Sequence, residues 1–280
     1  MKWLELEREG CIAGVENLLA SEDCWKNRYQ NLSDVDVQRV PECTDQFLLM
    51  IEAITERYRL IESLDVQSQF LNVQIFLLDD FRLRLAQISQ QLSSPWEEPF
   101  IQILNCAWYI AYVLDEWNEV DIFIRIQACG KRAHFRGVFD DVADMYRHIW
   151  QQRARDLTVA FYQHIRARIR RYERENWFSW DSCESLDLTA SFCPFLLEVR
   201  RLLNYVNSVI SPVSAAKIYE LLNEKVADVL LKTITNISIK LVFIVSCIGD
   251  TRKISETFQP YSSHSNDCFY VIQVKKRAVR

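Results

Sequence analysis

Apolar residues recur at helical spacing along most of the chain. The clearest case is the segment 65–92, whose apolar positions are three or four residues apart and are widened by further apolar neighbours. The spaced positions are Phe70, Val73, Leu77, Phe81 and Leu85, and the neighbours are Leu71, Leu78 and Ile88. Such spacing places the side chains along one face of an α-helix. The pattern predicts a long helix that is buried along much of its girth.

The same pattern predicts seven helices in all. Their expected ranges are 2–20, 42–61, 65–92, 99–128, 138–174, 194–210 and 212–232. Pro41 suits the start of the second helix, and "SSPWEEP" separates the third from the fourth with two prolines. Long helices joined by short loops pack as antiparallel neighbours. The sequence therefore predicts an all-α fold, an elongated multi-helix bundle or rod.

The C-terminal part of the chain departs from this pattern. The stretch "ISIKLVFIVSCI" gives no amphipathic helical stripe and is rich in β-branched residues, and the last fifty residues hold eight Lys/Arg and three Asp/Glu. We predict a helical region at 1–231 and a divergent, basic tail at 232–280. A strand, a buried segment and sequence without a fold of its own all remain open for the tail.

Composition further restricts the fold class and the kind of protein. The chain has only five glycines and six prolines, too few for the many turns of an all-β fold, and its net charge of −5 argues against a nucleic-acid-binding surface. Nine scattered cysteines without a CxxC pair are typical of reduced core cysteines in the cytoplasm. The charged start "KWLELEREG" is not that of a signal peptide, and no apolar run is long enough to predict a membrane span.

One stretch suggests chemistry. In "GVFDDVADMYRHIW" (137–150), Asp140, Asp141 and Asp144 are spaced as in the DDxxD motif with which helical enzymes hold magnesium and ionise prenyl diphosphates. On a helix, carboxylates three or four residues apart are neighbours and can share a cation. An enzyme of this class also needs a second acidic site that faces the first. A magnesium-dependent prenyl diphosphate synthase or cyclase is therefore one hypothesis.

The alternative is that the acids only begin a helix. The positive end of the helix dipole favours acids in the first turns, and Asp144 has Arg147 and His148 three and four residues later. The other Asp-Asp pair, in "LLDDFRLRL", is followed by arginines and has no third acid. The sequence holds no NDxxSxxxE, HExxH, GxSxG or Gly-rich phosphate-binding motif. We favour this reading and predict no catalytic, cofactor-binding or metal-ligating residue.

The end of the same helix is basic. Five arginines lie within nine residues: Arg166, Arg168, Arg170, Arg171 and Arg174. Positive charge at a helix C-terminus is favoured by the dipole. Binding of an acidic partner or of phospholipid head groups is the alternative reading.

Six stretches, in this order, resemble one family. They are "SEDCWKNRYQNLSDVDVQRVPECTDQFLLMIEAITERYRLI" (21–61), "QFLNVQIFLLDDFRLRLAQI" (69–88), "ILNCAWYIAYVLDEW" (103–117), "VFDDV" (138–142), "YERENWFSW" (172–180) and "SFCPFLLEVRRLL" (191–203). The order is similar to that in the RINT/Tip family of vesicle-tethering subunits, which includes the Rad-interacting protein of animals and the Tip subunit of the yeast Dsl complex. The resemblance covers about 1–231.

The resemblance implies a non-enzymatic, all-helical rod of the tethering-complex (CATCHR) type that serves Golgi-to-ER retrograde vesicle transport. The partners it implies are Zeste-white/Dsl-type and NAG/Sec-type tether subunits and ER SNAREs. The implied location is the cytoplasm, peripheral at the endoplasmic reticulum membrane through these partners. Animal members are also linked to a cell-cycle checkpoint, so a helical scaffold with that role only remains an alternative.

Two departures accompany the resemblance. The family's N-terminal coiled coil is expected to be absent from this chain, and the family's C-terminal helices are expected to give way to the tail at 232–280. The resemblance also accounts for "LLDDF" and "VFDDV" without a metal, as polar contacts on or between helices in a family without known catalysis.

Overall fold

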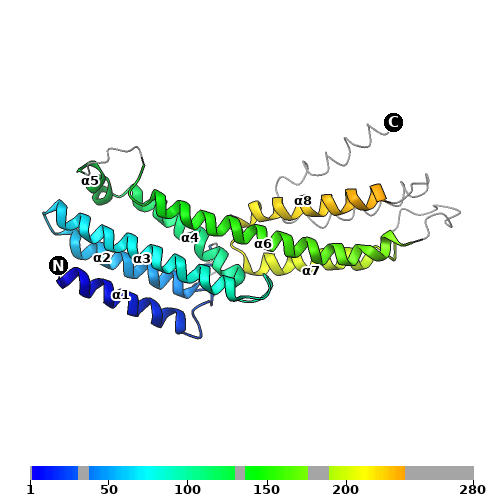
Figure 1. Cartoon of the computed structure of the whole chain (residues 1–280), viewed down its shortest axis with the longest axis horizontal. Coiled ribbons are helices and arrows are strands. Elements are labelled where there is room, and N and C mark those ends of the chain that lie inside the picture. The colour runs from blue at the N-terminus through cyan, green and yellow to red at the C-terminus, as the bar shows by residue number, and fades with distance from the viewer. Residues whose placement is uncertain (1, 31–37, 130–135, 176–188, 237–280) are drawn as a thin grey trace. The chain divides into compact units, whose positions relative to one another are not determined.

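The computed structural model describes residues 2–30, 38–129, 136–175 and 189–236. Within these ranges the chain forms eight α-helices and no strand, which confirms the predicted all-α multi-helix fold (Figure 1). The helices are α1 (Lys2–Ala20), α2 (Glu42–Arg59), α3 (Leu64–Gln91), α4 (Phe100–Asn118), α5 (Asp121–Cys129), α6 (Asp140–Glu173), α7 (Cys193–Val209) and α8 (Pro212–Asn236).

The chain divides into two compact units. Unit 1 comprises Met1–Ala154 and unit 2 comprises Arg155–Arg280, so α6 contributes its first turns to unit 1 and the rest to unit 2. Each unit has its own buried apolar side chains.

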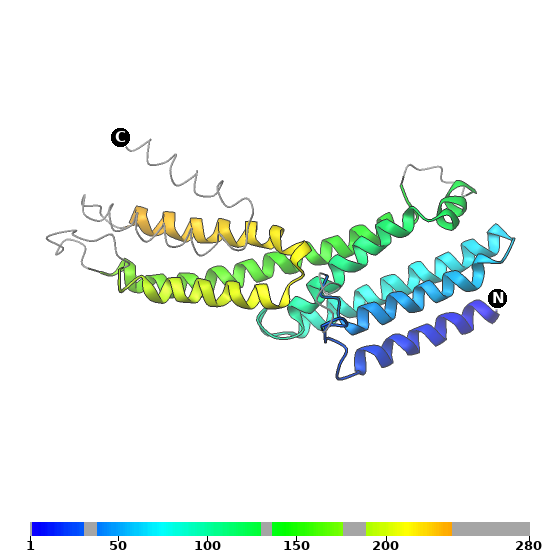
Figure 2. The same cartoon turned by 180° about the vertical axis from the view of Figure 1, so that it is seen from behind.

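Unit 1 is built around α3. Figures 1 and 2 show α1, α2 and α3 lying side by side, with α1 on the outside. The apolar stripe predicted for α3 is buried, and Phe81 stacks on Phe47 of α2 with ring centroids 4.1 Å apart. Since α2 turns Ile51 and Ile54 toward the same core, both with 0% exposure, the two helices cover each other's apolar faces.

A polar network lies inside this core. The hydroxyl of Tyr58 donates to the Gln74 carbonyl at 2.8 Å, while the Gln74 amide nitrogen donates to Thr55 Oγ1 at 2.7 Å and to the Ile51 carbonyl at 2.9 Å. Burial raises the pKa of Tyr58 to about 12, so this hydroxyl remains a donor at physiological pH. Each buried polar group of the network has a partner, which fixes the register of α2 on α3.

The connection between α1 and α2 is held by its own backbone. Residues 24–28 pair with residues 40–43 through hydrogen bonds from Arg28 N to Val40 O (2.9 Å) and from Cys43 N to Cys24 O (3.0 Å). The buried carboxylate of Asp45 accepts a hydrogen bond from the Tyr29 hydroxyl at 3.1 Å and lies 3.5 Å from Arg28 Nε. The "SEDCWKNRYQ" and "VPECTDQF" stretches are therefore two halves of one local structure.

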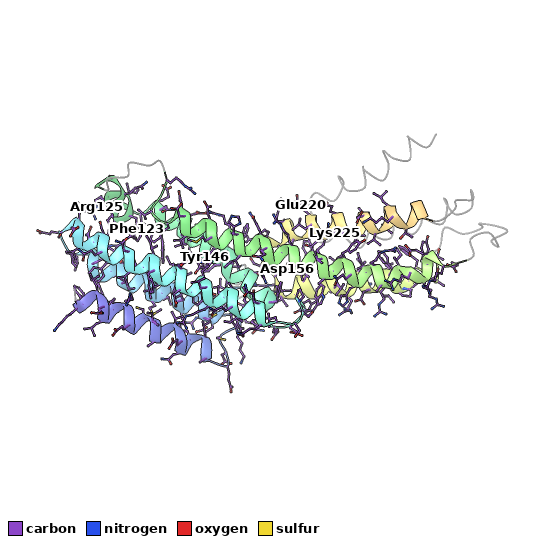
Figure 3. All side chains as sticks on the ribbon, in the orientation of Figure 1. Phe123, Arg125, Tyr146, Asp156, Glu220 and Lys225 are labelled. Atoms are coloured by element: carbon purple, nitrogen blue, oxygen red, sulfur yellow. The ribbon has the colours of Figure 1, made fainter. Side chains whose placement is uncertain are left out.

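The single helix predicted at 99–128 is wrong, because the chain turns at 119–120 and forms α4 and α5 instead. The turn lets Phe123, labelled in Figure 3, pack edge-on against Phe139 with centroids 4.8 Å apart, and it leaves Trp117 against the same ring at 5.8 Å. No glycine or proline marks this turn, and the aromatic spacing continues across it. The break therefore depends on tertiary packing of the aromatic cluster.

The first turns of α6 close unit 1. Tyr146, labelled in Figure 3, is fully buried, and its hydroxyl donates to the Leu78 carbonyl of α3 at 2.7 Å. Ala143 and Ala154, both with 0% exposure, keep this face of α6 narrow. A small-residue face allows close packing of the helix backbone on its neighbours.

Unit 2 packs the second half of α6 with α7 and α8, which lie side by side in both views (Figures 1 and 2). Its core is aromatic and β-branched: Phe161, Ile165, Ile169, Phe195 and Val199 all have 0% exposure. Tyr172 near the end of α6 packs on Phe192 at the start of α7, with ring centroids 4.9 Å apart. The Thr233 hydroxyl of α8 donates to Glu173 at 3.1 Å, which joins the ends of α6 and α8.

The structure describes only the first residues, 232–236, of the predicted tail. The helix predicted at 212–232 is observed as α8, which continues to Asn236 and so enters the segment predicted to be divergent. Residues 237–280, and with them the stretch "ISIKLVFIVSCI" beyond that helix, lie outside the described residues. The same holds for residues 31–37, 130–135 and 176–188, which lie between predicted helices.

Two leucines of α3 test how far unit 1 depends on its core. Leu85 has 0% exposure and Leu83 has 45%. We expect Leu85→Ala to cost about 2–5 kcal/mol, because it leaves a cavity, and Leu83→Ala to cost less than about 1 kcal/mol. Thermal and urea denaturation followed by circular dichroism measure both. Equal midpoints for the two variants would contradict the assigned orientation of α3.

Candidate functional site

The acidic cluster at the start of α6 has a structural role. Asp140 accepts a hydrogen bond from the backbone nitrogen of Gly137 at 2.8 Å, three residues earlier. The side chain of Asn118, at the end of α4, donates to Asp140 Oδ1 at 2.7 Å and accepts from the Phe139 nitrogen at 3.0 Å. Free N–H groups at a helix start need such acceptors. The acid therefore caps α6 and ties it to α4.

Gly137 is required by this arrangement. A Cβ atom built at this position would lie 2.3 Å from the Asn118 side chain. Only glycine allows Asn118 to approach the helix start closely enough to accept from Phe139. The contact explains why a glycine stands three residues before Asp140, the first residue of α6.

Two arginines engage the carboxylates of the cluster. Arg136 lies 3.8 Å from Asp140 and 3.5 Å from Asp141, and it donates to Asp144. Arg147 donates to Asp144 at 2.8 Å and also pairs with Asp115 of α4. The Arg147 guanidinium, and after it Arg136, lowers the pKa of Asp144. The predicted pairing of Asp144 with Arg147 is confirmed.

The three acids thus face cations of the protein itself. Arg136 contacts all three carboxylates, and within the described ranges no group of three or more His, Cys, Asp or Glu side chains is placed to hold a metal ion. The second Asp-Asp pair is likewise engaged, with Asp79 2.7 Å from Arg82 and Asp80 2.7 Å from Arg84. The geometry gives the magnesium hypothesis no support.

The described cysteine side chains are also structural. Cys11, Cys24, Cys43 and Cys106 are buried and free, and Cys193 is free and half-buried. Burial raises the pKa of Cys106 well above its ordinary value, and the Thr44 hydroxyl donates to its sulfur at 2.7 Å. Four of the five described thiols thus lie in the core, as the sequence predicts.

A matched pair of aspartates tests the capping role. Asp140 makes the hydrogen bonds that start α6, whereas the side chain of Asp141 is 86% exposed. We expect Asp140→Ala to lower the free energy of unfolding by about 1 kcal/mol and Asp141→Ala to change it by less than about 0.5 kcal/mol. Chemical denaturation measures both. The reverse order would show that Asp140 does not cap the helix.

A second charged site lies along α6 and α7 in unit 2. The carboxylate of Glu198 is nearly buried, and it accepts hydrogen bonds from Arg201 at 2.7 and 3.2 Å. His164 Nδ1 of α6 lies 3.4 Å from the same carboxylate. Arg201, followed by His164 and Arg168, lowers the pKa of Glu198 against the opposing effect of burial.

The lowered pKa of Glu198 gives a pH dependence. Stabilisation by this carboxylate is fully present above the ordinary glutamate pKa of about 4.3 and is lost as the pH falls through the lower folded-state value. We expect Glu198→Gln to destabilise unit 2 by about 1 kcal/mol at neutral pH, and we expect the difference from the wild type to shrink as the pH falls below about 4.3 and to vanish below the lowered folded-state pKa. Thermal midpoints measured across this pH range test it.

Glu220 of α8, labelled in Figure 3, provides the control. Its side chain is 67% exposed and pairs only with Lys217 among the described residues. Glu220→Gln should leave the midpoint nearly unchanged at every pH, since an exposed ion pair contributes little. An equal effect of the two substitutions would contradict the special position of Glu198.

Most arginine side chains at the basic end of α6 are exposed to solvent. Arg166 pairs with Glu173, whereas Arg168, Arg170, Arg171 and Arg174 are exposed. In the described part of the chain, no helix is long and apolar enough to cross a membrane. The described surface also carries scattered exposed apolar side chains, among them Leu6, Leu60 and Leu197.

The described chain consists of long amphipathic helices that pack into bundles and expose charged faces. This arrangement defines the class of protein as a helical scaffold. Comparison with known proteins gives the family. The model of the RINT-1/TIP-1 family matches residues 1–237, and the chain belongs to this family. The resemblance inferred from the six sequence stretches is thereby confirmed.

Two relatives extend the comparison. The chain is 31% identical to the RINT1-like protein of Drosophila melanogaster over 180 residues, which are 63% of this chain and 24% of that protein. Its fold is similar, with a TM-score of 0.65 and 13% identity, to a chain of the crystal structure of the SNARE Sec20 bound to the Dsl1 complex subunit Tip20. That match covers 92% of this chain and 45% of the other. The chain spans less than half the length of either relative.

Proposed function

We propose that this chain is a helical part of a non-enzymatic tethering subunit that acts in Golgi-to-ER retrograde vesicle transport. It binds other tether subunits and ER SNAREs, and it is held at the cytoplasmic side of the endoplasmic reticulum membrane through these partners. The family match over residues 1–237 carries the proposal.

The fold adds support. The similar solved structure contains Tip20 bound to a SNARE, and the similarity extends over 92% of this chain. Helices of 25 to 34 residues, such as α3, α6 and α8, place binding surfaces tens of ångströms apart at 1.5 Å per residue. A tether needs such reach and stiffness more than it needs a catalytic pocket.

The expected mechanism is docking of helix faces. An amphipathic helix of a SNARE or of a neighbouring subunit would lay its apolar face on a groove between helices. Such interfaces take most of their affinity from a few buried apolar or aromatic side chains. Correct packing of the bundle is therefore a precondition for binding.

Affinity isolation tests the proposal. The full chain, carrying a tag and expressed in eukaryotic cells, should recover ER SNAREs and tether subunits above the level obtained with an unrelated helical bundle of similar size. Quantitative mass spectrometry measures the recovery. Recovery of neither class by the folded chain would contradict the proposal.

The leucine pair of α3 supplies matched controls. Leu85→Ala, which weakens the core, should reduce recovery in proportion to the loss of folded protein, while Leu83→Ala should leave it unchanged. Equal recovery by a Leu85→Ala protein that is shown to be unfolded would mean that the contacts do not depend on the bundle.

A further inference from the structure

The two units differ in the sign of their charge. The described residues of unit 1 include 23 Asp/Glu and 13 Lys/Arg, whereas those of unit 2 include 7 Asp/Glu and 11 Lys/Arg. The chain as a whole has a net charge of −5. A basic unit within an acidic chain needs a local explanation, because the average composition does not supply one.

Most of the described arginines of unit 1 pair with carboxylates, although Arg125 does not. In unit 1, arginines on three helices pair with carboxylates: Arg57 with Glu7, Arg84 with Asp80 and Glu16, and Arg147 with Asp115 and Asp144. Near the end of α6, by contrast, Arg170, Arg171 and Arg174 are exposed and make no ion pair with any described carboxylate. We call these three residues the arginine cluster.

The helix dipole alone does not require this cluster. About half a unit of negative charge is associated with a helix C-terminus, and one or two cations offset it. Arg166 and Arg168 already lie near this end, the first paired with Glu173 and the second beside Glu198. Three further arginines on adjacent turns repel one another, so the cluster costs free energy unless an anion lies near it.

Two other helices bring positive groups to the same end of unit 2. Lys232 of α8, which pairs with Asp228, lies over the Tyr162 ring of α6 at 5.5 Å. The next residue, Thr233, contacts Glu173 near the end of α6. The N-terminus of α7 meets the end of α6 through Phe192 and Tyr172, and a helix N-terminus carries partial positive charge. The cluster therefore belongs to a basic end of the unit rather than to one helix alone.

The face is suited to a diffuse array of anions. The exposed positions of α6 over its last turns are Gln163, His164, Ala167, Arg168 and the cluster, and none of these is a large apolar residue. Protein docking usually needs apolar or aromatic anchors that are buried in a groove. A lipid surface needs only accessible cations, each contributing through the negative surface potential.

We infer that the basic end of unit 2, through Arg170, Arg171 and Arg174, binds the surface of an anionic lipid membrane directly. This contact is independent of the SNAREs and tether subunits of the proposed function. It would orient unit 2 toward the membrane while the partners provide specificity. The interaction is electrostatic, so it weakens as the salt concentration rises.

Vesicle flotation with the purified full chain tests the inference without any partner protein. We expect the chain to bind vesicles of phosphatidylcholine with phosphatidylserine at low salt and not vesicles of phosphatidylcholine alone. Replacing all three arginines (Arg170→Gln, Arg171→Gln and Arg174→Gln) should weaken binding on the order of a hundredfold. Replacing the same three with lysine should retain most of the binding, because the charge is kept.

A control with the same change in net charge separates the cluster from charge in general. Lys2→Gln, Arg59→Gln and Arg125→Gln remove three exposed cations of unit 1 and should leave vesicle binding within a few-fold of the wild type. Circular dichroism and thermal midpoints should show that every variant is folded, since all substituted side chains are exposed.

Several results would overturn the inference. They are equal binding to neutral and anionic vesicles, no binding to anionic vesicles at low salt, and equal losses in the two glutamine triples. A further one is a cluster variant that binds vesicles normally but loses an acidic protein recovered by the wild type, because the surface would then bind protein. Since no SNARE or tether subunit is present in flotation, failure here leaves the proposed function to its own test.

Discussion

A helix of 28 residues in water gains most of its stability from the neighbours that cover its apolar stripe. In unit 1 that helix is α3, and its stripe is covered by α2 through the stacked pair of Phe47 and Phe81. The buried Gln74 fixes the register, because its amide is satisfied only where Tyr58, Thr55 and Ile51 are in reach. Apolar burial supplies the driving force, and the polar network selects one alignment of the helices.

The helix starts are a second constraint. α6 begins where it does because Asp140 and Asn118 satisfy N–H groups that would otherwise have no partner inside the bundle. Gly137 leaves room for this contact. A cluster with the spacing of a metal site is thus part of a joint between two helices, and its charge is balanced by Arg136 and Arg147.

These packing constraints also bear on the proposed function. The chain belongs to the RINT-1/TIP-1 family and resembles Tip20 in fold, and the arrangement of its helix faces in unit 1 depends on the same burial that holds α3 in place. The two units differ in how their arginines are paired. Most described arginines of unit 1 lie next to acids, whereas Arg170, Arg171 and Arg174 at the end of α6 are exposed.

The sequence by itself determined the helical class and most helix limits, since apolar spacing and prolines are local signals that depend only on the period of the helix. The observed Leu64–Gln91 and Cys193–Val209 differ by a single residue at each end from the predicted ranges. The sequence also indicated, through Arg147, that Asp144 had a local partner. Tertiary structure decided the break between α4 and α5, because Phe123 and Phe139 meet only after the chain has turned. It also decided the role of Asp140, because the Asn118 side chain that completes the cap comes from another helix, 22 residues away in sequence.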